Sequence, residues 1–317
     1  MRDCLKFFIP VVFGLLSGMV SASYLPSAPP YEETFGALQQ DQYGLRYGVV
    51  NWDEQASHKL QETLELLSVS DKFSHRLKYV QGKKIVFILD DSGSMMNWSD
   101  DIPIDQYLRP LHGHQKITRW DELKQTVRSA IGIYGGLSRE GVDFYFLNRG
   151  AVHDVKAYEQ MEESLLQDPT SKHLTPLSDT LEAVIQDHGE VDSGLVINII
   201  TDGEPRSKNR DDSNKRFEKV LKKIMAQYKN VWINVRLCTD EESVVETYNA
   251  YDNKIKHIDV CDDYQAESVE VKRFKNINMT RGEYLLKTTI GAADQTPGKD
   301  NFDRWDEPTD VQCCIVL

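Results

Sequence analysis

Three oxygen-bearing side chains at alternate positions form the pattern in this sequence with the clearest chemical meaning. Asp90, Ser92 and Ser94 directly follow the apolar run 85–89. Carboxylate and hydroxyl oxygens are hard donors, which suit Mg²⁺ or Ca²⁺ better than Zn²⁺. Gly93 lets the backbone curl between the two serines, so that the three side chains can converge on one point. The pattern therefore predicts a divalent-cation site at the end of a strand.

Two further oxygen donors are expected at the same edge of a sheet. A second apolar run, 195–201, leads directly into Asp202. Open α/β sheets bind their ligands at the carboxyl ends of parallel strands. If the two strands are neighbours, Asp202 faces Asp90 across the crevice between them. Thr175 precedes an expected helix, where its hydroxyl could point into the same crevice, which makes a cage of five oxygen-bearing residues.

Strands and helices alternate along the chain, and this order predicts the fold that must position the cage. Continuous apolar runs indicate strands buried on both faces, and apolar residues at helical spacing indicate amphipathic helices. Strands are expected at 84–90, 142–147, 195–201, 232–237 and 257–260. Helices are expected at 53–68, 118–134, 156–166, 177–187, 217–224, 241–250 and 264–275. The predicted fold is α/β and doubly wound, with a mainly parallel sheet and helices on both faces.

Composition along the chain predicts five regions. Residues 1–22 have the pattern of a signal peptide, and residues 23–52 form a Pro- and Gly-containing leader. A helical lead-in is expected at 53–82 and the α/β domain at 83–277. The remaining residues, 278–317, are rich in charge, Gly and Pro and are expected to form a polar tail.

Charge and cysteine content exclude several classes of function. The chain of 317 residues has a formal net charge of −13, so it lacks the positive excess that would neutralise nucleic-acid phosphates. Its five cysteines include no C-x-x-C pair, which argues against a structural zinc site. Cys238 and Cys261 are expected to be buried free thiols. A disulfide between them is the alternative, because both follow strands that should be neighbours.

The five-residue cage resembles the metal-ion-dependent adhesion site (MIDAS) of the von Willebrand factor A (VWA) domain family. That family uses a D-x-S-x-S motif, a distant Thr and a distant Asp, in the order found here. The resemblance covers about residues 84–275, and the surroundings of Asp90 and Asp202 are also similar to the family. The stretches 118–124 and 141–148 are similar to eukaryotic members with a single VWA domain. One departure is His173-Leu174, which stands where the family has two glycines before the Thr.

The resemblance implies a particular division of roles among the five residues. Ser92, Ser94 and Thr175 would hold Mg²⁺ (or Mn²⁺) directly, while Asp90 and Asp202 would act largely through water. An ion with few carboxylate ligands stays electrophilic, so an Asp or Glu of a protein partner could complete its coordination. The implied function is a metal-dependent adhesion or scaffold module that binds an acidic protein group, and no catalytic activity is expected.

Two alternatives share part of this pattern. A VWA-fold scaffold with an unused metal site would have the same sequence features. An aspartate-nucleophile phosphatase also places an Asp after its first strand with Mg²⁺, but it needs a second acid where this chain has Ser92. The adjacent Asp91 falls outside the alternate spacing and is expected to be a surface or capping residue.

The two ends of the chain indicate conflicting locations. At the N-terminus, Arg2 and Lys6 are followed by the apolar run 7–20. This pattern predicts a cleaved signal peptide and a secretory or extracellular protein. The last four residues, beginning at Cys314, match the C-a-a-X prenylation motif, and Cys313 could carry a palmitoyl chain. Two lipid chains would hold the protein on the cytoplasmic face of a membrane. Prenylation is cytosolic, so at most one of these signals is used.

Two sequons for N-glycosylation complete the candidate sites. They are Asn97-Trp-Ser and Asn278-Met-Thr. A glycan on Asn97, three residues after Ser94, would crowd the predicted metal face.

Overall fold

The structure is a computed structural model, and it describes residues 54–99, 117–138, 140–206, 213–297 and 301–307. All of these belong to one compact unit, Tyr43–Leu317. The predicted signal peptide, the leader and the lipidation candidates Cys313 and Cys314 lie outside the described residues.

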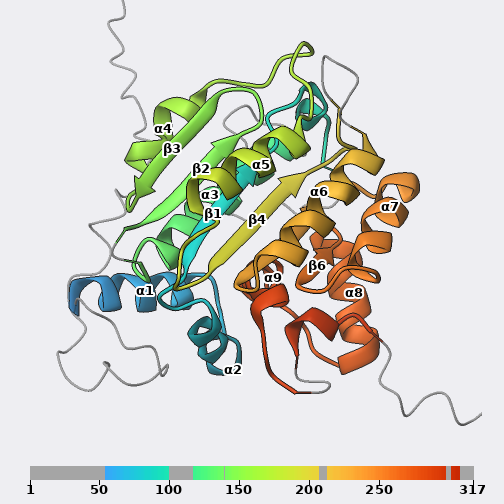
Figure 1. Cartoon of the computed structure of the whole chain (residues 1–317). Coiled ribbons are helices and arrows are strands. Elements are labelled where there is room, and N and C mark those ends of the chain that lie inside the picture. The colour runs from blue at the N-terminus through green and yellow to red at the C-terminus, as the bar shows by residue number, and fades with distance from the viewer. Residues whose placement is uncertain (1–53, 100–116, 139, 207–212, 298–300, 308–317) are drawn as a thin grey trace, which may run out of the picture. The chain divides into compact units, whose positions relative to one another are not determined.

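A six-stranded sheet of order β3-β2-β1-β4-β5-β6 organises the described part of the chain (Figure 1). The strands are β1 (Lys84–Leu89), β2 (Val142–Phe146), β3 (Gly150–Val155), β4 (Leu195–Thr201), β5 (Val231–Leu237) and β6 (Ile258–Cys261). All neighbouring strands pair in parallel except β3, which is antiparallel to β2. This arrangement confirms the predicted α/β fold with a mainly parallel sheet.

Helices cover both faces of the sheet. They are α1 (Glu54–Leu66), α2 (Asp71–Ser74), α3 (Arg119–Tyr134), α4 (Glu159–Leu166), α5 (Leu177–His188), α6 (Asn214–Gln227), α7 (Glu242–Asp252), α8 (Tyr264–Lys275) and α9 (Arg281–Ile290). Alternate side chains of β1 divide between two cores, because successive residues of a strand point to opposite faces. Phe87 packs in the core that includes Trp120 of α3, whereas Val86 packs in the core that includes Leu181 of α5.

The antiparallel edge strand β3 is the strand that the sequence analysis missed. Most of its side chains are exposed, and only Val155 is fully buried. An edge strand needs no continuous apolar run, because one side of it meets solvent. The sequence Gly150–Val155 therefore lacks the pattern from which the other five strands were predicted.

The predicted lead-in and the predicted tail both contribute to the main core. Phe73 of α2 packs among the same buried side chains as Phe87 of β1. Helix α9 approaches the loop after α1 so closely that a Cβ on Gly282 would lie 2.4 Å from the carbonyl oxygen of Leu67. The amide of Asn234 in β5 donates to the carbonyl oxygen of Thr289 at 3.1 Å.

The domain boundary at 277 was therefore wrong, since apolar side chains beyond it belong to the main core: Tyr284, Leu285, Leu286, Ile290, Ala293, Phe302 and Trp305. Phe302 and Trp305 are fully buried, and their rings lie 4.8 Å apart. The sequence of residues 278–317 suggested a polar tail because α9 contains charged and hydroxyl side chains, which the fold buries. Lys287, for example, is fully buried and lies 3.0 Å from Glu267 of α8.

Two further expectations can be compared with the described residues. Cys238 and Cys261 are buried free thiols, as predicted. None of the helices in the described ranges combines the length and the apolar character needed to cross a membrane.

Candidate metal centre

The two strands that lead into Asp90 and Asp202, β1 and β4, are direct neighbours in the sheet. Leu89 pairs with Ile200, and the backbone N–H of Asp90 donates to the carbonyl oxygen of Ile200 at 2.9 Å. Asp90 and Asp202 therefore leave adjacent parallel strands at the same edge of the sheet.

A chain of hydrogen bonds joins four of the five predicted ligands. The backbone N–H of Ser92 donates to Asp90 Oδ1 at 2.8 Å, which turns the loop back on the end of the strand. The hydroxyl oxygens of Ser92 and Ser94 lie 3.0 Å apart. Ser94 then donates to Asp202 Oδ1 at 2.7 Å. The i, i+2, i+4 spacing thus brings oxygens from both strand ends together.

Asp90 is the buried anchor of this chain. Its second carboxylate oxygen accepts a hydrogen bond from the Thr201 hydroxyl at 2.6 Å, so both oxygens are in use. Burial, followed by repulsion from the Asp202 carboxylate, raises the pKa of Asp90 to about 7. A positive charge near these two acids would therefore favour the ionised form of Asp90.

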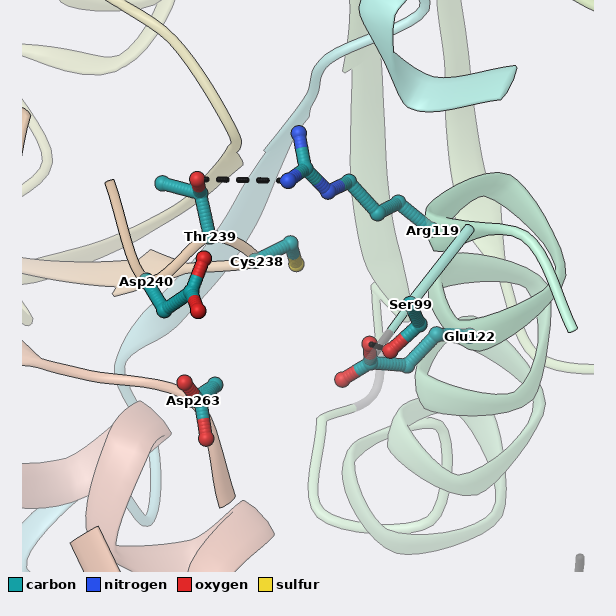
Figure 2. A pocket seen from close by; sticks show the side chains of 7 residues that line it. All are labelled: Ser99, Arg119, Glu122, Cys238, Thr239, Asp240 and Asp263. Carbon is teal, nitrogen blue, oxygen red and sulfur yellow. Dashed lines mark hydrogen bonds between the residues drawn. The ribbon is translucent and has the colours of Figure 1, made fainter. Parts of the chain in front are cut away.

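Arg119 supplies the first positive charge at the site. Its Nη1 lies 2.8 Å from Asp202 Oδ2, and its Nη2 donates to the hydroxyl of Thr239 at 3.3 Å (Figure 2). The sequence analysis did not select Arg119. One sequence signal pointed to an acidic partner for Arg119. It is the first residue of α3, directly after the capping residue Thr118, and a cation is unfavourable at a helix N-terminus unless an acid lies beside it.

Arg119 also lines a small pocket at the ends of β5 and β6 (Figure 2). The lining residues are Ser99, Arg119, Glu122, Cys238, Thr239, Asp240 and Asp263. Two of its acids already have partners: Glu122 pairs with Arg236, and Asp263 accepts from two backbone N–H groups at the start of α8. Burial raises the pKa of the Cys238 thiol, which makes it a poor nucleophile.

Thr175, the fifth predicted ligand, is fixed by its backbone. It forms an isolated antiparallel bridge with Arg206, with N···O distances of 3.0 and 2.7 Å. The loop before it contacts the serine motif, where a Cβ on Gly93 would lie 2.8 Å from the Cα of Ser171. Within the described ranges, the Thr175 hydroxyl makes no hydrogen bond to the other four residues. The structure thus places the Thr175 loop beside the motif without joining its side chain to the oxygen chain.

His173, two residues before Thr175, anchors this loop. Its Nδ1 lies 3.0 Å from the carbonyl oxygen of Asp91, and its own carbonyl accepts from the Gly93 N–H at 3.4 Å. His173 therefore adds a side-chain contact between the Thr175 loop and the serine motif.

Asp91 is not a surface residue, which corrects that part of the expectation. It is fully buried, and Oδ1 accepts from the backbone and side-chain N–H groups of Asn148 at 2.9 and 2.8 Å. Arg149 Nε lies 2.9 Å from Oδ2. Asn148 also donates to the carbonyl oxygen of Leu174 at 2.7 Å. Asp91 therefore anchors the β2–β3 turn, and Asn148 extends that support to the Thr175 loop.

The two sequons lie on exposed side chains. Asn97 follows the short helix Gly93–Met96, and its N–H donates to the carbonyl oxygen of Ser94 at 2.8 Å. Asn278 lies in the segment between α8 and α9. Exposure permits glycosylation at either position, but it does not indicate that either is modified.

A second group of side chains that could hold a metal ion lies in β2, β3 and α5. Its members are Asp143, His153 and His188. The sequence analysis missed this group, because its three residues come from three elements and one of these is the overlooked strand β3. The available signal was Asp143 itself, the one charged residue in an otherwise apolar strand.

Comparison with known proteins found no matching family model and no matching curated protein. Doubly wound α/β folds support many unrelated functions. The function must therefore be inferred from the residues at the strand ends.

Proposed function

We propose that this protein binds Mg²⁺ (or Mn²⁺) at Asp90, Ser92, Ser94, Thr175 and Asp202, and uses the ion to capture an acidic group of a protein partner. This is the activity that the resemblance to a VWA adhesion site implies. The observation that carries the proposal is the continuous chain of oxygens from Ser92 through Ser94 to Asp202.

The spacing of these oxygens supports an octahedral ion. Mg²⁺ binds oxygen at about 2.0–2.1 Å, so neighbouring ligand oxygens lie about 3 Å apart. The hydroxyl oxygens of Ser92 and Ser94, two of the expected direct ligands, are 3.0 Å apart. Ser94 donates to Asp202 Oδ1 at 2.7 Å, which places this carboxylate behind the ligand as a hydrogen-bond acceptor. All the donors are hard oxygens, which matches the preference of Mg²⁺. The donor set and its spacing therefore fit the ion.

The charges at the site support an acidic partner. The hydrogen bonds of Asp90 support a role in orienting the ligands rather than in binding the ion directly. Both oxygens of Asp90 accept hydrogen bonds, so this carboxylate orients Ser92 and Thr201. The ion would supply an electrophilic position that a carboxylate can occupy. Arg119, with a side chain 15% exposed, adds a second positive charge beside it. Because Arg119 already pairs with Asp202, it offsets one of the two acids of the site and leaves the charge of the ion for a partner's Asp or Glu.

Mg²⁺ is expected to raise the melting temperature of the wild-type protein, and to raise it more as the pH increases. The pKa of Asp90 in the metal-free protein is raised to about 7, against about 3.9 for a free Asp. Protonated Asp90 therefore stabilises the metal-free protein fully below about pH 4. This stabilisation is lost as the pH rises through about 7, where the buried carboxyl group ionises. Mg²⁺ requires the ionised carboxylate, so the metal-induced increase should grow over the same range and level off above it.

Differential scanning fluorimetry with and without millimolar MgCl₂, from about pH 5 to about pH 8, measures this effect. NaCl at matched ionic strength is the control for general salt effects. If Mg²⁺ and Mn²⁺ both leave the melting temperature unchanged at every pH, the metal-binding proposal is wrong and the fold carries an unused site.

A further inference from the structure

We propose that Asp143, His153 and His188 form a second metal site, which binds a transition-metal ion of the Zn²⁺ type. Asp143 lies near the beginning of β2, at the opposite edge of the sheet from Asp90, which follows the end of β1. Helix α5 spans the distance between the two edges, since it begins two residues after Thr175 and ends at His188. The second site is therefore separate from the proposed Mg²⁺ site.

The three donor atoms already converge. His153 Nδ1 and His188 Nε2 each lie 3.0 Å from Asp143 Oδ2, and all three atoms lie within 4.8 Å of one another. Zn²⁺ binds His nitrogen and carboxylate oxygen at about 2.0–2.2 Å, which separates neighbouring tetrahedral ligands by about 3.4 Å. Small side-chain adjustments would therefore admit the ion.

The identity of the donors selects the class of metal. Two imidazoles and one carboxylate suit Zn²⁺ and its neighbours in the transition series, whereas Mg²⁺ and Ca²⁺ prefer oxygen throughout. The Asp143 side chain is 2% exposed and that of His153 is 50% exposed, so the group opens to solvent on one side. Three protein ligands with solvent access leave a fourth position for water or for an external ligand.

A surrounding set of contacts orients the three ligands. Lys84 Nζ and the backbone N–H of Asp154 donate to Asp143 Oδ1 at 2.8 and 2.9 Å, which leaves Oδ2 facing the imidazoles. The ring of Tyr145 lies edge-on to both imidazoles, with centroid distances of 5.4 Å to His153 and 6.1 Å to His188. The two hydrogen bonds to Asp143 are typical of a ligating carboxylate, because outer partners orient it before the ion binds.

A hydrogen-bonded cluster without metal is the competing explanation. Burial alone would raise the pKa of Asp143, but hydrogen bonds from His188, His153, Lys84 and the Asp154 N–H outweigh it and lower the pKa. The other groups that face the cluster are the Tyr145 hydroxyl, 3.1 Å from His188 Nε2, and the Asp187 carboxylate, to which Tyr145 donates. Protons and a metal ion would compete for the imidazoles, so an experiment with metal separates the two explanations.

Co²⁺ is the probe, because its visible absorption reports coordination by nitrogen ligands. The full chain is titrated with CoCl₂ in millimolar MgCl₂, which keeps the first site filled, and Zn²⁺ is then added in competition. We expect a 1:1 complex whose visible bands disappear as Zn²⁺ displaces Co²⁺. His153→Ala and His188→Ala should each weaken binding by at least about tenfold.

The control variants are His58→Ala and Asp90→Ala. His58 is an exposed histidine on α1, so its replacement removes a surface imidazole that lies outside the cluster. Asp90→Ala removes the first site and should leave Co²⁺ binding unchanged, which separates failure of this proposal from failure of the Mg²⁺ proposal. His153 lies on an exposed edge strand, so His153→Ala is the variant most certain to fold. Absence of the bands in wild-type protein, or equal binding by His153→Ala and wild type, would overturn the proposal.

Discussion

Replacing Asp90 with alanine is expected to abolish the thermal stabilisation that Mg²⁺ gives the wild-type protein. The carboxylate holds the N–H of Ser92 and the hydroxyl of Thr201, so its loss releases the loop that aligns the two serines. It also removes one of the two negative charges that an ion would neutralise. A ligand at about 100 times its Kd stabilises a protein by about 2.7 kcal/mol, and the variant should lose this gain entirely.

The matched control for this variant is Ser171→Ala. Ser171 is an exposed serine whose backbone contacts Gly93, but its hydroxyl does not belong to the oxygen chain. It should keep the wild-type response to Mg²⁺. Ser94→Ala provides a second test if Asp90→Ala does not fold, because Ser94 is exposed and bridges Ser92 and Asp202. A full Mg²⁺ response in both Asp90→Ala and Ser94→Ala would rule out the proposed ligands.

Replacing Trp305 with alanine is expected to lower the free energy of unfolding by about 3–5 kcal/mol. The Trp305 side chain is 1% exposed, and its ring lies 4.5 Å from Phe73 and 4.8 Å from Phe302 in edge-to-face geometry. Its removal would leave a cavity between the residues before β1 and the residues after α9. Urea denaturation followed by circular dichroism measures the change.

Val269→Ala is the control for this second prediction. Val269 on α8 is 60% exposed, so its truncation should change the free energy of unfolding by less than about 0.5 kcal/mol. A Trp305→Ala variant as stable as Val269→Ala would mean that residues 301–307 do not contribute to the core.

The strands of the central sheet were predictable because they are buried on both faces. The runs 85–89 and 195–201 needed no tertiary information. Their adjacency in the sheet was only a condition of the predicted site, and the structure shows it. Helix α3 was predictable from its capping box, in which Thr118 and Asp121 exchange hydrogen bonds. These features are local, so the sequence contains them in full.

The features that the sequence analysis missed depend on partners far along the chain. Helix α9 looked like part of a polar tail because Lys287 is charged, yet Glu267 and the Cys261 thiol surround that charge inside the core. The same limit applies to the second candidate metal site, where Asp143 and His188 are 45 residues apart in the sequence and meet only in the fold. Pairing between distant residues leaves no periodic pattern from which it could be predicted.

At the first candidate site, some residues could be predicted from local spacing, and others could not be predicted because they depend on distant contacts. The alternate spacing selected Asp90 over Asp91, and the structure gives the two acids different surroundings. Asp90 anchors the serine loop, whereas Asp91 holds Asn148 and Arg149 in the β2–β3 turn. Arg119 was not predicted, because its role depends on contact with Asp202 from a helix that begins 83 residues earlier in the chain.

The central claim is that the protein holds a metal ion with an open position for a carboxylate. Water-proton relaxation with Mn²⁺ tests this claim most directly. The protein is loaded with Mn²⁺ while Zn²⁺ fills the second site, and a short C-terminally amidated peptide containing one Glu is added, with the matching amidated Gln peptide as control. We expect bound Mn²⁺ to enhance relaxation through its exchangeable waters, and the Glu peptide alone to reduce that enhancement. No enhancement, or an equal response to both peptides, would contradict a metal-dependent docking site for an acidic partner.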